Sequence, residues 1–151
     1  MGTDIHTYAE RPINGKWEAM RELDNELFGA RNYDVFGFLA NVRNICAVPA
    51  IAAPRGLPDD VSDFVRNAYK PAHQEHTPSW LLASELLNFD YDRTVEDRRV
   101  AKQEDPGKPS TCGPGEGRMT TYRELLGEPF FCSLERLRGS GAERLVFFFD
   151  N

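Results

Sequence analysis

The segment 143-ERLVFFFDN-151 decides the fold that we predict from this sequence. From Arg144 to Phe149 it carries apolar side chains on both faces that an extended chain presents. This pattern is typical of a strand buried on two sides, because a half-exposed strand alternates apolar with polar residues. We therefore expect residues 144–149 to form a central strand of a sheet.

The N-terminal segment predicts a neighbour for that strand. Residues 4–10 and 16–20 flank 11-RPING-15, whose Asn14-Gly15 pair tolerates the positive φ of a tight hairpin turn. Side chains alternate along residues 4–10, so Ile5 belongs to an apolar face. The opposite, titratable face carries Asp4, His6, Tyr8 and Glu10. At the far end of that face, we expect Glu10 to be solvated.

Three further segments show apolar residues at helical spacing. In 31-RNYDVFGFLANVRN-44, Asn32 precedes a predicted helix of about three turns as its cap. Residues 59–69 predict a second helix behind acidic capping residues. In 76-HTPSWLLASELLNF-89, either Thr77 or Ser79 is expected to cap a third helix.

The C-terminal half is less uniform. A capping-box pattern from Thr121 to Glu124 predicts a helix that stops at Gly127, and a second amphipathic helix follows. Residues 91–101 carry mixed charges and predict no element. Residues 102–118 are rich in Gly and Pro, which favours a flexible surface loop.

Together these elements predict an α+β fold. We expect an antiparallel sheet that includes the N-terminal hairpin and the C-terminal strand, with about four to five helices packed mainly on one face. A chain of 151 residues suits one domain, which we place at 1–151 with the flexible loop at about 102–118.

Composition predicts a cytoplasmic globular protein. The chain is 40% hydrophobic and 28% charged, and it shows neither a secretory signal pattern nor an apolar run of the ~20 residues that span a bilayer. The net charge of -6 argues against non-specific coating of nucleic acid, which depends on clustered Lys and Arg. The three cysteines are widely spaced and predict free thiols rather than a disulfide framework or a zinc site.

Four motifs occur in a specific order: MGTDIHTYAE (1–10), RNYDVFGFLANVRN (31–44), PRGLPDDVS (54–62) and HTPSWL (76–81). They resemble a widespread family of small phage, prophage and bacterial proteins. Its members begin Met-Gly-Cys-Asp-Ile-His and continue with Arg-Asn-Tyr, Pro-Arg-Gly-Leu-Pro and His-Ser-x-Ser-Trp-Leu. This chain differs in Thr3, where cysteine is usual, and in Thr77-Pro78. The resemblance implies a phage setting and a set of site residues, without an activity.

The motif residues are mostly hydrogen-bond donors and stacking surfaces, the groups that hold an anionic planar ligand such as a nucleotide. We expect a ligand site formed by Asp4, His6, Arg31, Asn32, Tyr33, Arg55, His76, Ser79 and Trp80. In particular, we expect His6, His76 and the two arginines to surround one cavity. Plainer structural roles stay open for several of them: a helix cap for Asn32 and Ser79, and a rigid Pro-flanked connector around Arg55.

The same residue types permit two kinds of catalytic chemistry. Asp4, His6, His73 and His76 are metal-ligand types, but no HxxxH or thiolate pair accompanies them, so we predict neither a metal nor another cofactor. His6 and His76 could act as general acid and base on a phosphodiester, if the fold brings them together.

Three function classes follow. The leading one is a phage or prophage protein that binds a small anionic ligand, such as a nucleotide, and sequesters a host defence signal. The second is a hydrolase or phosphodiesterase that uses His6 and His76. The third is an inhibitor that contacts a host protein through acidic surface residues. The sequence leaves open whether the chain forms a homo-oligomer.

Overall fold

The computed structural model describes residues 2–101, 105 and 107–151. The described residues form two compact units. The first unit comprises Met1–Arg31, Pro54–Phe89 and Glu128–Asn151, and the second comprises Asn32–Ala53 and Asp90–Gly127. Five α-helices and an antiparallel sheet lie within the described residues, so the expected α+β fold is confirmed.

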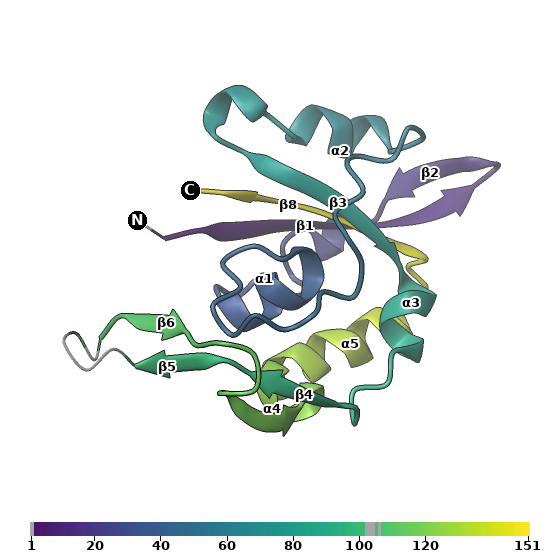
Figure 1. Ribbon diagram of the computed structural model, residues 1–151. Helices are drawn as coiled ribbons and strands as arrows, with labels where there is room; N and C mark the ends of the chain where they lie inside the picture. Colours follow the sequence, from purple (N-terminus) through teal and green to yellow (C-terminus); the bar gives the residue numbers. More distant parts are fainter. Residues whose placement is uncertain (1, 102–104, 106) are drawn as a thin grey trace. The chain divides into compact units, whose positions relative to one another are not determined.

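A four-stranded antiparallel sheet organises the first unit (Figure 1). Its order is β2 (Lys16–Ala19), β1 (Asp4–Ile13), β8 (Arg144–Asp150) and β3 (His76–Leu82). The C-terminal strand β8 is central, as its apolar run predicts. Phe147, Phe148 and Phe149 are all fully buried, and each such side chain contributes about 1.5–3 kcal/mol of transfer free energy.

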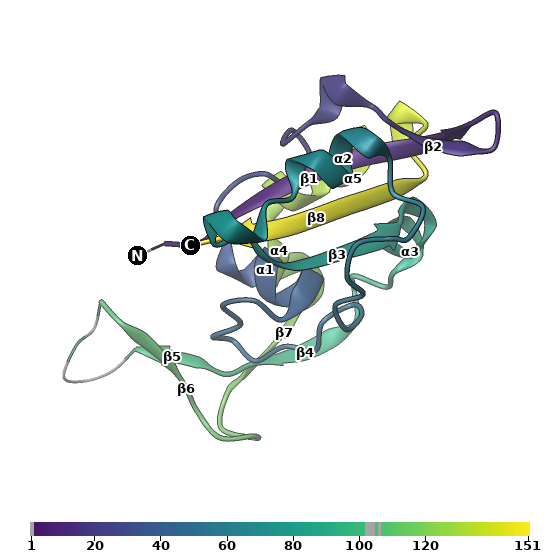
Figure 2. The same cartoon turned by 90° about the horizontal axis from the view of Figure 1, so that it is seen from above.

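Helices lie on both sides of this sheet (Figures 1 and 2). Helix α2 (Asp63–Ala68) covers the face that carries Tyr8 and Phe148, and its Val65 packs between them and Val61. Helix α5 (Glu128–Ser140) lies on the opposite side, beside α3 (Ala83–Asn88). Two short 3-10 helices complete the unit at Arg21–Leu23 and Pro71–His73.

The predicted hairpin is present at β1 and β2. Asn14 and Gly15 connect the strands with φ values of 52° and 80°, the left-handed conformation that the Asn-Gly pair was expected to supply. This turn positions β2 at the edge of the sheet.

The helix predicted over residues 77–89 is wrong in its first half. His76–Leu82 form strand β3, which pairs with β8, and the helix α3 begins only at Ala83. Residues 80–82 are all apolar, and such a short run fits a helix as well as a strand. The strand forms because these residues pair with the edge of β8 that β1 leaves open. Pro78 is tolerated because β3 is an edge strand.

The expected solvation of Glu10 is also wrong. Glu10 is fully buried and lies opposite Arg144 in the β1–β8 register. Arg144, with only 3% of its surface exposed, donates from Nε to Glu10 Oε1 at 2.8 Å, and the amide of Ser62 donates to Glu10 Oε2 at the same distance. The carboxylate is therefore buried with both oxygens bonded.

The second unit is built around α1 (Tyr33–Ala40), which the Asn32 side chain caps as predicted, by accepting from the amides of Asp34 and Val35. The helix is shorter than predicted because Asn41 adopts a left-handed conformation, with φ 59°, and ends it. In the same unit, Thr121 caps α4 (Tyr122–Leu126), which contacts α1, and Gly127 ends α4 at φ 80°.

Residues 91–121 contain short strands that the sequence did not predict. Strand β4 (Thr94–Asp97) pairs with β7 (Arg118–Thr121), and β5 (Arg99–Ala101) pairs with β6 (Pro109–Thr111). The loop predicted at 102–118 thus contains β6 and the start of β7 in its described part, while residues 102–104 and 106 lie outside the described residues. Within the described ranges, no helix has the length and apolar character needed to cross a membrane.

The buried pair leads to a stability prediction. Glu10→Gln removes the buried one of the two carboxylates that bind Arg144 and leaves Asp60, so we expect the free energy of unfolding to fall by about 1.5–3 kcal/mol in urea titrations followed by circular dichroism. The double variant Glu10→Gln/Arg144→Met removes both charges and should be more stable than Glu10→Gln alone. A Glu10→Gln protein within about 0.5 kcal/mol of the wild type would contradict a structural role for the pair.

Candidate functional site

The predicted site residues lie in three places rather than around one cavity. Four of them lie at the end of the sheet where β1 and β3 begin and β8 ends: Asp4, His6, Arg31 and His76. Arg55, Ser79 and Trp80 lie further along β3, on the strand itself or bonded to it. The remaining two, Asn32 and Tyr33, belong to the second unit.

At the sheet end, the titratable groups of β1 are already paired. Arg31 donates from Nε and Nη2 to the two carboxylate oxygens of Asp4, at 2.7 Å each, and this guanidinium lowers the pKa of Asp4 below its usual range. His6 Nε2 lies 2.7 Å from Asp150 Oδ2, and its ring packs on Phe148 with 5.4 Å between centroids.

The second histidine points to the other face of the sheet. The His76 ring is stacked 6.1 Å from the ring of Phe149, and its Nε2 lies 3.3 Å from the Asn151 side-chain oxygen. Neighbouring residues of a strand face opposite sides, so a ring on Phe149 and a ring on Phe148 are separated by the sheet. The two histidines are therefore not placed as an acid–base pair.

Three other predicted residues have structural roles. The Asn32 oxygen accepts from the first amides of α1, which are the groups that an anion would need. Tyr33 packs on Phe36, 5.7 Å away between ring centroids. Ser79 is buried, and its hydroxyl accepts from the amide of Arg55 at 3.0 Å, which fixes the Arg55 turn against β3.

Arg55 and Trp80 meet in a pocket of about 600 Å³ in the first unit, which we call the twin-tryptophan pocket. Its lining consists of Trp17, Arg55, Leu57, Pro58, Asp59, Asp60, Trp80, Leu82 and Arg144. Trp17 comes from β2 and Trp80 from β3, while the segment before α2 supplies the residues from Leu57 to Asp60. Strands at both edges of the sheet therefore contribute an indole ring.

Arg144 stacks against both indoles. Its guanidinium carbon lies 3.9 Å from the ring centroid of Trp17 and 5.9 Å from that of Trp80. A guanidinium over an aromatic face is favourable, and more so when it is desolvated, as this one is. The ion pair with Glu10 therefore orients the group on which Trp17 rests.

Asp60 joins the same network from the pocket rim. One of its oxygens accepts from Arg144 Nη1 at 2.7 Å, and the other accepts from the indole nitrogen of Trp17 at 3.0 Å. The hydrogen bond from Arg144 is the main cause that lowers the pKa of Asp60. Asp60 thus holds Trp17 and Arg144 in one arrangement.

Arg55 forms the opposite wall. Its guanidinium carbon lies 4.7 Å from the Trp80 ring centroid, and Nη1 donates to the Trp80 carbonyl at 3.2 Å. The two terminal nitrogens also bind both carboxylate oxygens of Glu85, at 2.7 and 2.8 Å. The side chain of Arg55 is 28% exposed, so its guanidinium is accessible in a way that Arg144 is not.

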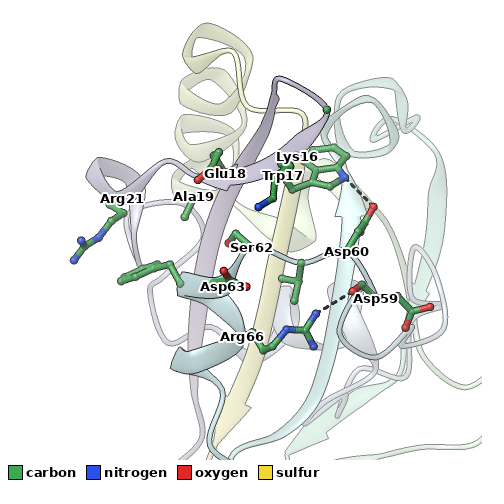
Figure 3. Close-up of a pocket in the computed structure, with 13 residues that line it drawn as sticks. Lys16, Trp17, Glu18, Ala19, Arg21, Asp59, Asp60, Ser62, Asp63 and Arg66 are labelled. Carbon is green, nitrogen blue, oxygen red and sulfur yellow. Dashed lines mark hydrogen bonds between the residues drawn. The ribbon is translucent and has the colours of Figure 1, made fainter.

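A neighbouring pocket of about 430 Å³ shares Trp17, Asp59 and Asp60 with the twin-tryptophan pocket (Figure 3). Figure 3 shows the Trp17 indole nitrogen facing Asp60, and Arg66 reaching the backbone at Asp59. The charges that line this pocket are Lys16, Arg21 and Arg66 together with Glu18, Asp59, Asp60 and Asp63. Trp80 does not line this pocket, so a planar ligand would find only one of the two indole rings there.

The sequence alone did not point to Trp17 or Arg144 as site residues, and it suggested Asp60 only as one of the acidic surface residues of the inhibitor hypothesis. Arg144 and Glu10 each end a predicted strand, and antiparallel pairing of those strands would have been the signal that they meet. Trp17 carried no such signal, because a single aromatic residue in a hairpin is ordinary. Among the described residues, no group of three or more His, Cys, Asp or Glu side chains is placed to hold a metal ion.

The lowered pKa of Asp60 predicts a pH dependence. A carboxyl group whose pKa falls below 3.8 on folding adds stability that is fully present above about pH 4 and is lost as pH falls through the folded value. The Asp60 side chain is 66% exposed, which limits the gain to about 1 kcal/mol or less.

We therefore expect Asp60→Asn to lower the free energy of unfolding by a constant amount between about pH 7 and about pH 4.5. The difference from the wild type should shrink below about pH 3.8, as measured in parallel urea titrations. A difference that grows with acidity would contradict the assignment.

Comparison with models of protein families, with curated proteins and with solved structures finds no match to this chain.

Proposed function

We propose that this protein binds a small planar anionic ligand, of the nucleotide class, in the twin-tryptophan pocket. The observation that carries the proposal is the pairing of two indole rings with two guanidinium groups around one pocket of about 600 Å³. Sites for small molecules typically measure about 300–1,000 Å³, with apolar walls and few polar groups. An aromatic ring stacked on a tryptophan is typically worth about 1–3 kcal/mol.

The two arginines differ in what they offer a ligand. Arg144 is buried and already bonded to Glu10 and Asp60, so it supports the pocket. Arg55 is more accessible, and its planar fork matches a carboxylate or phosphate. The anionic group of the ligand therefore belongs at Arg55, with the planar ring against the indoles.

The geometry favours binding over turnover. Ser79 is buried and bonded to the Arg55 amide, and His6 and His76 lie on opposite faces of the sheet at its other end. The hydrolase alternative thus lacks the proton-transfer pair that it requires. The inhibitor alternative has less support as well, because Asp60 is engaged by Arg144 and Trp17.

In the phage or prophage setting that the sequence resemblance implies, such a binding protein would sequester a host signal nucleotide. Sequestration needs affinity and slow release but no chemistry on the ligand. A sequestering protein releases the intact ligand after binding, whereas an enzyme releases a product.

The chain carries its own reporter for the test. Trp17 and Trp80 are its two tryptophans, and both line the pocket, so intrinsic fluorescence monitors this site. We expect members of a panel of linear and cyclic nucleotides to quench it and to be depleted from solution. Heat denaturation should then release them intact, whereas an altered product would indicate catalysis. Absence of both quenching and depletion would refute the proposal.

Two alanine substitutions distinguish a ligand site at the twin-tryptophan pocket from one at the histidine end of the sheet. Trp80→Ala should weaken nucleotide binding on the order of 5- to 150-fold, the equivalent of one lost stacking contact. His6→Ala changes a residue of β1 that does not line the pocket, two strand positions from the level at which Trp80 pairs with β8, and serves as the control with unchanged affinity. Circular dichroism on both variants checks that the fold is retained. Equal loss in both variants would place the site elsewhere.

A further inference from the structure

Arg55, which lines the twin-tryptophan pocket, pairs with Glu85 outside that lining in the geometry of ligand recognition. Arg55 Nη1 and Nη2 donate in parallel to Glu85 Oε2 and Oε1, at 2.8 and 2.7 Å. Arginine binds a carboxylate or phosphate of a ligand through the same two-pronged contact. The contact with Glu85 therefore occupies the donors that an incoming anion would use.

Glu85 has a second partner that it keeps when Arg55 leaves. Its Oε2 also accepts from the amide of Leu82 at 2.8 Å, at the start of α3. The Glu85 side chain is 34% exposed, so water can replace the bonds to Arg55. When Arg55 releases the Glu85 carboxylate, no charge is left buried without a partner, and the hydrogen bond at the start of α3 is retained.

Arg55 is likewise held by more than Glu85. Its backbone amide donates to Ser79, Nη1 donates to the Trp80 carbonyl, and the guanidinium lies on the Trp80 ring. These contacts keep the guanidinium at the pocket wall while its carboxylate partner changes. Replacing the Glu85 carboxylate at Arg55 by the anionic group of a ligand therefore changes the free energy little.

We infer that Glu85 is an internal competitor that holds the anion-binding fork of Arg55 until the anionic group of a ligand displaces it. This inference rests on the proposed function and adds the means by which the pocket selects its ligand. A neutral planar molecule stacks without disturbing Glu85 and gains nothing from Arg55. A nucleotide also binds Arg55. Its apparent affinity is lowered because Glu85 occupies the Arg55 donors in most unliganded molecules.

The test compares nucleoside monophosphates with their nucleosides, using the quenching of Trp17 and Trp80 at low ionic strength. Glu85→Gln keeps a side-chain oxygen for the Leu82 amide and loses the charge that binds Arg55. We expect this variant to bind adenosine and guanosine monophosphates at least about threefold more tightly than the wild type does. Affinity for adenosine and guanosine should be unchanged.

The matched control is Glu135→Gln, which makes the same change of charge on α5, where Glu135 contacts Arg138. It should behave as the wild type, which excludes a general effect of net charge. Arg55→Gln should abolish the preference for the monophosphate over the nucleoside, with or without Glu85→Gln. Thermal unfolding of each variant confirms that it is folded.

The outcomes separate this inference from the proposed function. Wild-type binding of the monophosphates with no gain in Glu85→Gln would overturn the inference and leave the proposed pocket standing. A gain that also appears for the nucleosides, or in Glu135→Gln, would overturn it as well. Failure of every monophosphate and nucleoside to bind any variant would refute both.

Discussion

The ion pair between Glu10 and Arg144 is the constraint from which the rest of the first unit follows. Both groups are buried, and they lie on neighbouring strands, 134 residues apart in the chain. Two charges removed from water are tolerated only when they meet, so the pair specifies how β1 aligns with β8. A slip of one residue would turn Arg144 toward the other face and move every phenylalanine of β8 with it. Ser62 and Asp60 bond to the same pair and so hold the start of α2 against the sheet.

The twin-tryptophan pocket is a consequence of that constraint. Glu10 fixes the Arg144 guanidinium, which lies over the Trp17 ring, and Asp60 bonds to both Arg144 and Trp17. The histidine end of the sheet is different in kind. There, Asp4, His6 and His76 each bond to a neighbour at the ends of the strands, so polar side chains satisfy one another at the sheet edge. Arginine and aspartate thus pair at one end of the sheet and also line the pocket further along it.

Local patterns were enough to predict much of the fold. The apolar run of β8, the Asn14-Gly15 turn and the caps at Asn32 and Thr121 all act over a few residues, and each is where the sequence indicated. Strand β3 was mistaken for a helix because its pairing with β8 depends on residues more than sixty positions away. For the site, the sequence placed Arg55 and Trp80 in one expected ligand set, but their contact, like those of Trp17 and Arg144, depends on pairings that no local pattern encodes. Motif order also says nothing about which face a histidine occupies, so His6 and His76 were wrongly brought together.

The place of β8 in the chain has a further consequence, for how the protein forms during synthesis. The strand that joins β1 to β3 is also the one translated after both, so a nascent chain halted before residue 144 has a hairpin and an isolated strand without their common partner. Contacts of such long sequence separation form slowly, and open strand edges attract other chains in the interval. Synthesis of residues 144–150 would therefore give β1 and β3 their common partner and complete the four-stranded sheet.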